Sequence, residues 1–238
     1  MSSQYNKIGG HYSALKQLPL GLLELAAVKQ HIGDVRDLDV LDLACGTGDY
    51  SRKLVEWGAR KVVGLDISEG MVNKARRRFA GDNRLDFRVA DCSKPLDVGK
   101  FDLVLAIWFL NYAGSAEELT NMWRNISRCL KPGGRCLGIT INQDMLQQSV
   151  PDGPRFGLSL NIVEHVEGGV KFQICVHSSP LFMFESFMLE REIYEKCAEK
   201  AGIPNLNWMP PTDPMNPRVD FESFLRCPHF RLFTCNVE

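Results

Sequence analysis

The sequence lacks both a surplus of charge and a long apolar run. Its 238 residues carry a formal net charge of −1, which gives nucleic acid or an anionic membrane no general attraction, so we expect neither partner. The longest apolar stretch, Leu103 to Leu110, is far too short to cross a bilayer. The start, Met1 to Lys7, is polar and lacks the apolar segment of a signal peptide. We therefore expect a cytoplasmic protein.

Cysteine is present, but the patterns that give it a role are missing. The eight cysteines lie scattered through segments with strand or helix periodicity, without a Cys-x-x-Cys pair or a cluster with histidine. Structural zinc sites need such clusters, so no metal is expected. In a chain of this size the pattern is typical of reduced, mostly buried thiols in a cytosolic protein.

The most informative stretch runs from Val40 to Ser51. A short apolar run interrupted by Asp42 predicts a strand that is buried on both faces. The run ends at Gly46-Thr47-Gly48, after which apolar residues recur at helical spacing until Gly58. A strand, a glycine turn and a helix form the layout of a nucleotide-binding unit. The glycines let the backbone approach a ligand, and the helix N-terminus offers it free N–H groups.

One missing glycine separates two classes of cofactor. A dinucleotide site needs a third glycine in this turn, and Ser51 stands there instead. Asp66, at the end of the next apolar run, is well placed to accept hydrogen bonds from ribose hydroxyls. Together with Asp42 inside the strand, the pattern resembles motif I of the class I S-adenosylmethionine-dependent methyltransferases. The resemblance favours S-adenosylmethionine, with S-adenosylhomocysteine as product, over NAD.

The resemblance assigns roles to residues at several strand ends. It implies that Gly46 and Gly48 shape the bed for the methionine tail and that Asp66 holds the ribose. Asp91 and Cys92, after the third strand, are implied to meet the adenine. The complete set that we expect around the cofactor is Tyr5, Asp42, Ala44, Gly46, Gly48, Asp66, Ile67, Asp91, Cys92 and Ile107.

Alternating strands and helices predict one α/β domain over residues 1–238. We expect a Rossmann-like, seven-stranded, mostly parallel sheet with helices on both faces and an antiparallel last strand. The expected parts are an N-terminal lid and helix (1–33), a cofactor-binding core (39–141), a substrate-cover insertion (142–188), and a C-terminal helix with two strands (189–238). The Phe-Asp-x-Val at Phe101 and the Lys-Pro-Gly-Gly at Lys131 are further features of the family.

Two tyrosines, Tyr5 and Tyr12, precede the first core element. Taken alone, they fit aromatic contacts of an N-terminal helix. The resemblance instead implies a lid that folds over the cofactor and touches the substrate. After the fourth strand, Trp108, Asn111 and Tyr112 lie where ligands bind in open α/β sheets. We expect these residues, with Phe172, to form the substrate pocket.

The insertion after the fifth strand contains a predicted hairpin. Leu158 to Val166 and Val170 to His177 read as strands around a two-residue Gly168-Gly169 turn. That turn places Val163 opposite Ile174 and His165 opposite Phe172. The hairpin then covers a substrate, or it is a simple edge hairpin with a surface histidine.

The substrate class rests on weaker signals. Tyr-x-x-Ile-Gly-Gly near the start and Trp-x-x-Asn-Tyr-Ala after the fourth strand resemble small-molecule methyltransferases of natural-product pathways, including the toxoflavin pathway. The Asn-Pro-Pro-Tyr of nucleic-acid amino-methyltransferases is absent. A protein or nucleic-acid methyltransferase with a clustered charged face, a nicotinamide-dependent oxidoreductase and a catalytically silent relative remain alternatives. The acceptor and the oligomeric state stay open.

The expected reaction is an in-line displacement at the sulfonium methyl group. Because the sulfonium is already a strong electrophile, alignment and desolvation can supply most of the acceleration. A general base is needed only for a hydroxyl or a weakly acidic carbon. The candidates for that role are His11, His165 and Glu185.

Overall fold

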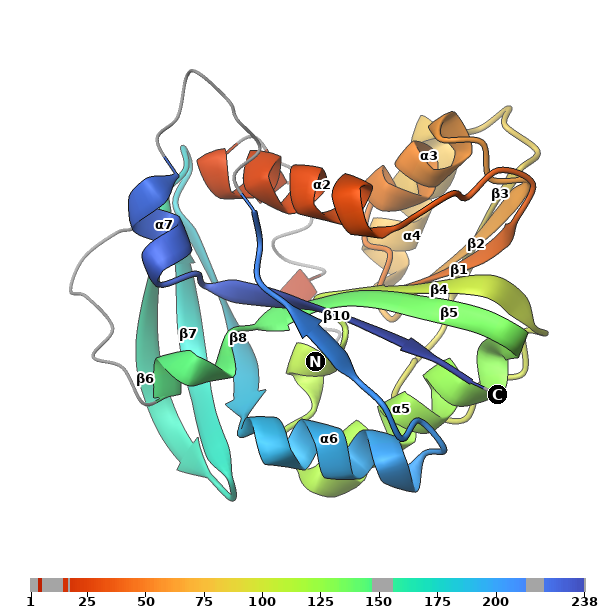
Figure 1. The fold of residues 1–238 in the computed structure, drawn as a ribbon. Helices are drawn as coiled ribbons and strands as arrows, with labels where there is room; N and C mark the ends of the chain where they lie inside the picture. The colour runs from red at the N-terminus through yellow and green to blue at the C-terminus, as the bar shows by residue number, and fades with distance from the viewer. Residues whose placement is uncertain (1–3, 6–14, 17, 147–155, 213–220, 238) are drawn as a thin grey trace.

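The chain folds around a seven-stranded sheet in the order β3-β2-β1-β4-β5-β10-β9 (Figure 1). The computed structural model describes residues 4–5, 15–16, 18–146, 156–212 and 221–237. His11 and Tyr12 therefore lie outside the described residues. The strands of this sheet are β1 (Asp39–Leu43), β2 (Lys61–Asp66), β3 (Leu85–Val89), β4 (Phe101–Ile107), β5 (Leu130–Ile141), β9 (Asn207–Met209) and β10 (Phe230–Asn236).

The strand directions confirm the expected fold class. The neighbouring pairs from β3 to β5 are parallel, whereas β10 runs antiparallel to both β5 and β9. The chain order reverses on either side of β1, since β2 follows it on one side and β4 lies on the other. In open α/β sheets the crevice at such a switch point is where ligands bind.

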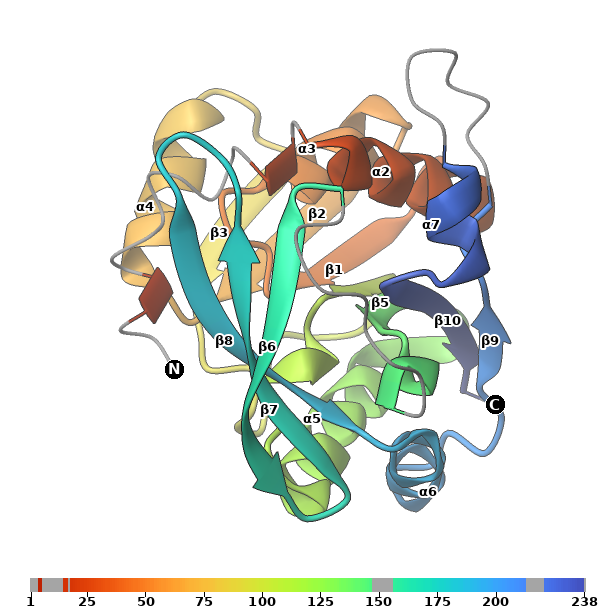
Figure 2. The same cartoon turned by 90° about the vertical axis from the view of Figure 1, so that its left-hand side faces the viewer.

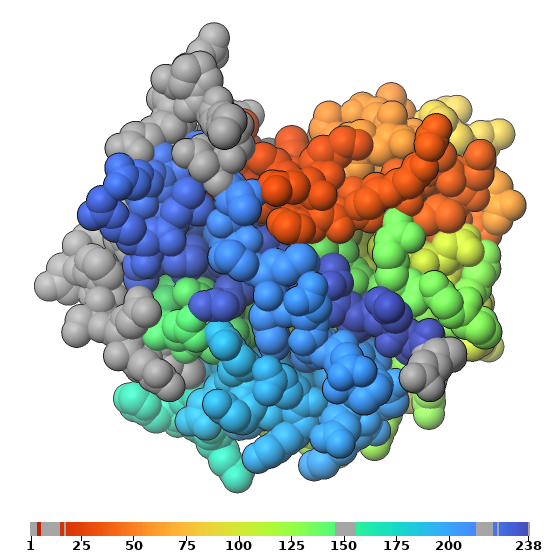
Figure 3. Space-filling model, viewed as in Figure 1, coloured from red at the N-terminus to blue at the C-terminus, as the bar shows by residue number. Residues whose placement is uncertain are grey.

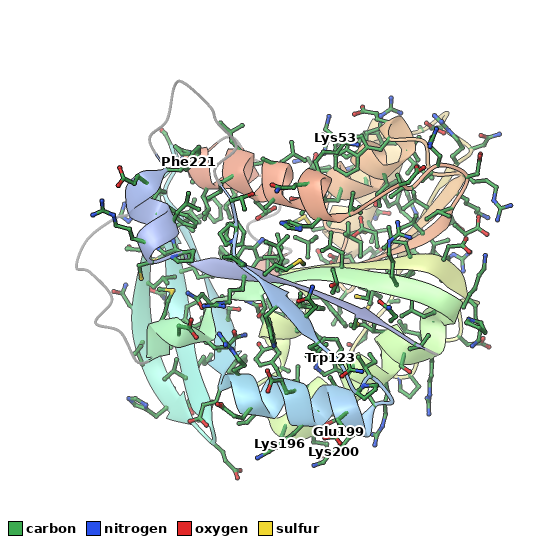
Figure 4. All side chains as sticks on the ribbon, in the orientation of Figure 1. Lys53, Trp123, Lys196, Glu199, Lys200 and Phe221 are labelled. Atoms are coloured by element: carbon green, nitrogen blue, oxygen red, sulfur yellow. The ribbon has the colours of Figure 1, made fainter. Side chains whose placement is uncertain are left out.

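Helices cover both faces of the sheet, with α2 and α3 on one side and α5 and α6 on the other (Figure 1). Two buried clusters fill these layers, and Figure 4 labels a member of each, Phe221 near α2 and Trp123 near α5. Figure 3 shows β9 and β10 as a blue surface between α2 and α6. The helices are α2 (Pro19–His31), α3 (Asp49–Glu56), α4 (Glu69–Arg78), α5 (Ala116–Cys129), α6 (Arg191–Lys200) and α7 (Glu222–Arg226), with 3-10 turns η2 (Leu110–Tyr112) and η3 (Gln143–Leu146).

Local signals set several helix starts. Ser68 accepts a hydrogen bond from the Met71 backbone N–H (3.3 Å) at the start of α4. Ser115 accepts one from the Glu118 N–H (3.2 Å) at the start of α5. The Glu118 carboxylate reaches back to the N–H of Gly114 (2.8 Å), one residue before the position that a capping box prescribes. In the described part of the chain, no helix is long and apolar enough to span a membrane.

A second sheet follows β5, as expected, and Figure 2 shows it in front of the main sheet. It has the order β6-β7-β8 and is antiparallel. Its buried face includes Phe172 and Val176, which pack onto the core of the molecule. Its strands are β6 (Leu158–Val166), β7 (Gly169–Val176) and β8 (Phe182–Leu189).

The predicted register of the hairpin is wrong. His165 pairs with Val170, and Phe172 pairs with Ile162. The turn uses Glu167 and Gly168, and Gly168 takes a left-handed φ of 69°. Gly169 instead begins β7, where a Cβ atom would stand 2.2 Å from the carbonyl oxygen of Met188. The second glycine is thus required by the neighbouring strand β8, and the turn moves back by one residue.

The other predicted pairing, between Val163 and Ile174, also fails. Ile174 pairs with Leu160 and not with Val163. The ladder also has an irregularity between Ile162 and Glu164, which adds a residue to β6. Moving the turn back by one residue shifts the partners near the turn by two, so His165 and Phe172 still line one cavity. The irregularity changes the pairing by one further residue between Ile162 and Leu158.

Candidate cofactor site

A cavity of about 200 Å³ lies at the switch point of the main sheet. Loops after β1 to β4, together with residue 5, build its wall. The described lining residues are Tyr5, Ala44, Gly46, Asp66, Ile67, Met71, Asp91, Cys92, Ser93, Ile107, Trp108, Phe109, Tyr112, Glu118 and Met122.

The two glycines of the turn have different tasks. Gly46 lines the cavity with φ 54°, and a Cβ atom added to it would meet no atom within 4 Å. Gly48 is not among the lining residues, and its Cβ atom would stand 2.7 Å from the ring of Phe87. Gly46 therefore leaves room beside the cavity, whereas Gly48, with φ 78°, leaves room for the packing of β3.

Asp66 joins the turns that follow β1 and β2. Its Oδ2 accepts a hydrogen bond from the N–H of Gly46 (2.8 Å), and its Oδ1 accepts one from the N–H of Ser68 (2.8 Å). Burial raises the pKa of this carboxyl, and the two backbone donors oppose the rise. Asp66 lines the cavity, as the sequence predicts for a ribose-binding acid.

Asp42 lies behind the turn and is not among the cavity's lining residues. Its Oδ2 accepts a hydrogen bond from the hydroxyl of Ser51 (2.6 Å). Burial raises the pKa of Asp42 to about 7, against the lowering effect of that bond. In this structure Asp42 fastens α3 to β1 and does not line the cavity where it was expected to touch the cofactor. Ser51, at the place of the missing glycine, supplies the link.

The loop after β3 carries the two residues that were predicted to meet the adenine. Asp91 and Cys92 line the cavity, with Ile67 and Ile107. The Asp91 Oδ1 accepts hydrogen bonds from the Ser93 N–H (3.0 Å) and from the Ser93 hydroxyl (2.6 Å). Burial raises the pKa of the Cys92 thiol to about 12, so the thiol stays protonated at neutral pH.

Asn125 of α5 holds this loop, and the sequence analysis did not identify it. Its side-chain amide donates hydrogen bonds to the carbonyls of Cys92 (2.8 Å) and Lys94 (2.7 Å), and its Oδ1 accepts one from the N–H of Leu96 (3.1 Å). Asn125 is buried in the otherwise apolar face of α5. The sequence signal that could have identified Asn125 is its position as a polar residue on the apolar face of an amphipathic helix.

Tyr5 closes one side of the cavity. Its ring meets that of Tyr112 edge to face, with centroids 5.6 Å apart, and the two hydroxyl groups are hydrogen-bonded. Gln4, next to it, bonds the backbone of Glu185 on β8 through both its amide atoms. Residues 4 and 5 thus contact both the segment after β4 and the second sheet. Burial raises the pKa of Tyr112 well above its usual value, so its phenol stays protonated.

Comparisons with known proteins agree with this geometry. A methyltransferase from Clostridium acetobutylicum ATCC 824, described as S-adenosylmethionine-dependent, has the same fold, with a TM-score of 0.68 at 19% identity over 98% of both chains. A family model described as a methyltransferase domain matches residues 40–134, which span the glycine turn, Asp66 and Asp91. Residues 40–134 therefore match a methyltransferase domain, and the whole chain has the fold of an S-adenosylmethionine-dependent methyltransferase.

Curated relatives match parts of this chain. A demethylmenaquinone methyltransferase of Lactococcus lactis subsp. lactis (strain IL1403) is 32% identical over 151 residues, which cover 61% of this chain and 57% of that protein. An mRNA cap guanine-N(7) methyltransferase of Schizosaccharomyces pombe is 32% identical over 123 residues, covering 47% and 34%. The chain spans about half the length of the first curated relatives it matches.

Trp108 forms part of the wall of this cavity at the end of β4. It takes a left-handed φ of 58°, which is unusual for a large side chain and typical of functional sites. Its indole N–H donates to a carboxylate oxygen of Glu24 (2.5 Å), a buried residue of α2. Glu24 also accepts a hydrogen bond from the hydroxyl of Tyr50 (2.7 Å) and pairs with Lys16. Sequence analysis missed Glu24, because its partners come from distant segments.

The remaining predicted site residues lie elsewhere. Asn111 is buried and accepts a hydrogen bond from Thr140 (2.9 Å), so it supports the strand end without lining the cavity. Glu185 pairs with Lys171 (2.6 Å) on the second sheet and lies outside the cavity lining. His165 and Phe172 line a different cavity. The structure therefore brings neither described candidate for the base to the cofactor cavity.

Proposed function

We propose that this protein transfers a methyl group from S-adenosylmethionine to a small-molecule acceptor and releases S-adenosylhomocysteine. The observation that carries the proposal is that Gly46 lines the cavity and that a Cβ atom added to it would meet no atom within 4 Å. The backbone of the turn is therefore open to a ligand in the cavity. When bound, the cofactor supplies an electrophilic methyl group, so the protein's task is to hold, orient and desolvate the reactants.

The lining fits the parts of this cofactor. Ala44 and Gly46 would bed the methionine tail, and Asp66 would accept hydrogen bonds from the ribose hydroxyls. A carboxylate oxygen has more than one acceptor site, so the bonds that Asp66 already accepts from backbone N–H groups leave capacity for a ligand. Asp91 would meet the adenine amine, and Ile67 would cover the ring.

The acceptor side of the cavity is aromatic. Trp108, Phe109 and Tyr112 follow β4 and line the cavity together with Tyr5. Such a wall suits a planar, partly apolar acceptor and excludes water from it. A relative named for demethylmenaquinone supports a small ring acceptor. Tyr112, whose pKa is raised by burial, would act as a hydrogen-bond donor and not as a base.

Calorimetric titration with S-adenosylhomocysteine tests the cofactor part of the proposal. We expect binding, and a melting shift equivalent to about 2.7 kcal/mol when the ligand is at one hundred times its dissociation constant. NAD serves as the matched control, because it would need the third glycine that Ser51 replaces. Binding of NAD without binding of S-adenosylhomocysteine would contradict the proposal.

A further inference from the structure

A second cavity, of about 1120 Å³, lies between η3 and the sheet β6–β8. Figure 1 shows this sheet at one end of the molecule, next to α6. Ile141 at the end of β5 and Phe172 of β7 belong to its apolar lining. Trp108 packs against the cluster that contains both residues, and it also lines the cofactor cavity. Trp108 therefore stands between the two cavities.

The lining of the second cavity contains an unsatisfied amide. Gln143 is 4% exposed, and neither its Oε1 nor its Nε2 has a hydrogen-bond partner among the residues that the structure describes. The Nε of Arg191, another lining residue, is also buried without a partner. Buried polar groups are nearly always hydrogen-bonded, and exceptions in a native structure need an explanation. Here the unsatisfied atoms comprise two donors and one acceptor beside a cavity.

The charges around the cavity argue for a neutral ligand. Arg191 already donates to Asp144 (2.6 Å), and Asp144 also pairs with Arg231. Glu190 and Glu192 add further carboxylates to the lining. Among the described lining residues, carboxylates therefore outnumber guanidinium groups, and these residues leave no surplus positive charge for a phosphate or a carboxylate ligand.

We propose that the second cavity holds the body of the methyl acceptor, and that this body is an apolar ring system with an imide edge. An imide places a carbonyl on each side of one N–H. Its two acceptors and one donor complement the unsatisfied donors of Gln143 and Arg191 and the unsatisfied acceptor of Gln143. Phe172, Val170 and Met188 supply apolar contact for the rings. The inference rests on the proposed function, because it names the substrate class of the same enzyme.

Naphthalimide is a suitable probe, since it is fluorescent, apolar and carries an imide edge. We expect it to bind the full chain about tenfold more tightly than N-methylnaphthalimide, which lacks the N–H donor. Tenfold corresponds to about 1.4 kcal/mol. The preference should vanish in Gln143→Leu, and a saturating amount of S-adenosylhomocysteine should not displace the probe.

Gln173→Leu is the matched control, because Gln173 adjoins Phe172 on β7 and is not among the residues that line the cavity. This variant should bind the probe as the wild type does. Gln143→Leu should melt at or above the wild-type temperature, because it removes a buried amide that has no partner. It should also keep its affinity for S-adenosylhomocysteine, which reports on the cofactor site separately.

Several results would overturn the inference. They are no binding of naphthalimide to the wild type, equal binding of both probes, and an undiminished preference in Gln143→Leu. Displacement of the probe by S-adenosylhomocysteine would place it in the cofactor cavity and would also count against the inference. A failure of the proposed function would be recognised separately, because neither the wild type nor the variants would then bind S-adenosylhomocysteine.

Discussion

The two cavities at the carboxyl end of the main sheet are built in different ways. In the cofactor cavity, the carboxylates of Asp66 and Asp91 are held by backbone N–H groups of adjacent turns. In the second cavity, the amide of Gln143 has no partner. The first site is formed by strand ends and is organised before any ligand arrives. The second has apolar walls and polar groups that a ligand would complete.

The largest expected effect is a loss of stability on substitution of Gly48, which packs against β3 and does not line the first cavity. Gly48→Val adds a branched side chain at φ 78°, where a Cβ atom already meets Phe87 at 2.7 Å. Backbone strain and overpacking each cost about 1–3 kcal/mol, so we expect a loss of roughly 5 kcal/mol in the free energy of unfolding. Denaturant unfolding measures it.

Gly46→Ala is the matched change at the cavity itself. Its Cβ atom enters open space, so the variant should fold at a cost of only about 1–2 kcal/mol for the left-handed backbone. We expect it instead to weaken S-adenosylhomocysteine binding at least tenfold. Normal affinity in Gly46→Ala would show that the turn is not the bed of the cofactor.

The next effect concerns the acid behind the turn. The folded-state pKa of Asp42 is raised to about 7 from 3.8, so the folded state favours the protonated form. This contribution to stability is fully present below pH 3.8 and is lost as the pH rises to about 7. Asp42→Asn keeps an acceptor for Ser51 and cannot ionise. We compare the free energy of unfolding of Asp42→Asn with that of the wild type at two pH values. The difference in favour of the variant should be larger at pH 8 than at pH 4, by on the order of 3 kcal/mol.

Unfolding measured across that pH range tests the assignment. If the difference between Asp42→Asn and the wild type is the same at both pH values, Asp42 does not titrate as its burial implies. Ser51→Ala is a useful companion variant. It removes the hydroxyl that donates to Asp42 and should raise the pKa of the carboxyl further.

A smaller effect is expected at Asp66, on binding. Charge-assisted hydrogen bonds contribute roughly 1.5–3 kcal/mol, so Asp66→Ala should weaken the cofactor by about one to two powers of ten. Asp66→Asn retains an acceptor oxygen and should lose less. Calorimetric titration of all three proteins gives the answer, with melting curves as control because Asp66 also holds Gly46 and Ser68. Equal affinities would remove Asp66 from the site.

The smallest effect is expected on the second sheet. Glu185→Gln breaks a partly exposed ion pair with Lys171, and such pairs contribute about 0–1 kcal/mol. The variant should keep its stability and its single-turnover rate of methyl transfer within about twofold. The prediction is contradicted if Glu185→Gln loses its rate and the wild-type rate depends on pH as the ionisation of a carboxylate would require. Glu185 would then take part in catalysis, although it lies outside the cofactor cavity.

Much of the cofactor site could be predicted because its signals are local. The run around Leu41, the turn at Gly46 and the cap at Ser68 each act within a few residues of the chain. Parallel strands bring their carboxyl ends to one edge, so Asp66 and Asp91 had to lie near the turn. The structure confirms these strands and the mostly parallel, seven-stranded sheet.

Other features could not be predicted, because contacts between distant segments determine them. The hairpin register depends on β8, which needs a glycine at Gly169, and sequence spacing alone placed the turn one residue too late. The role of Asp42 depends on Ser51, and the orientation of Trp108 depends on Glu24 of α2. None of these contacts leaves a periodic pattern in the sequence.

The sequence by itself determined the α/β fold and the glycine turn, because hydrophobic periodicity and turn chemistry act over short stretches. Only the tertiary structure decided which polar groups are satisfied and which are not. Gln143 illustrates this division, since nothing in its neighbourhood along the chain marks it. Burial of its amide without a partner results from the packing of η3 against strands that follow later in the chain.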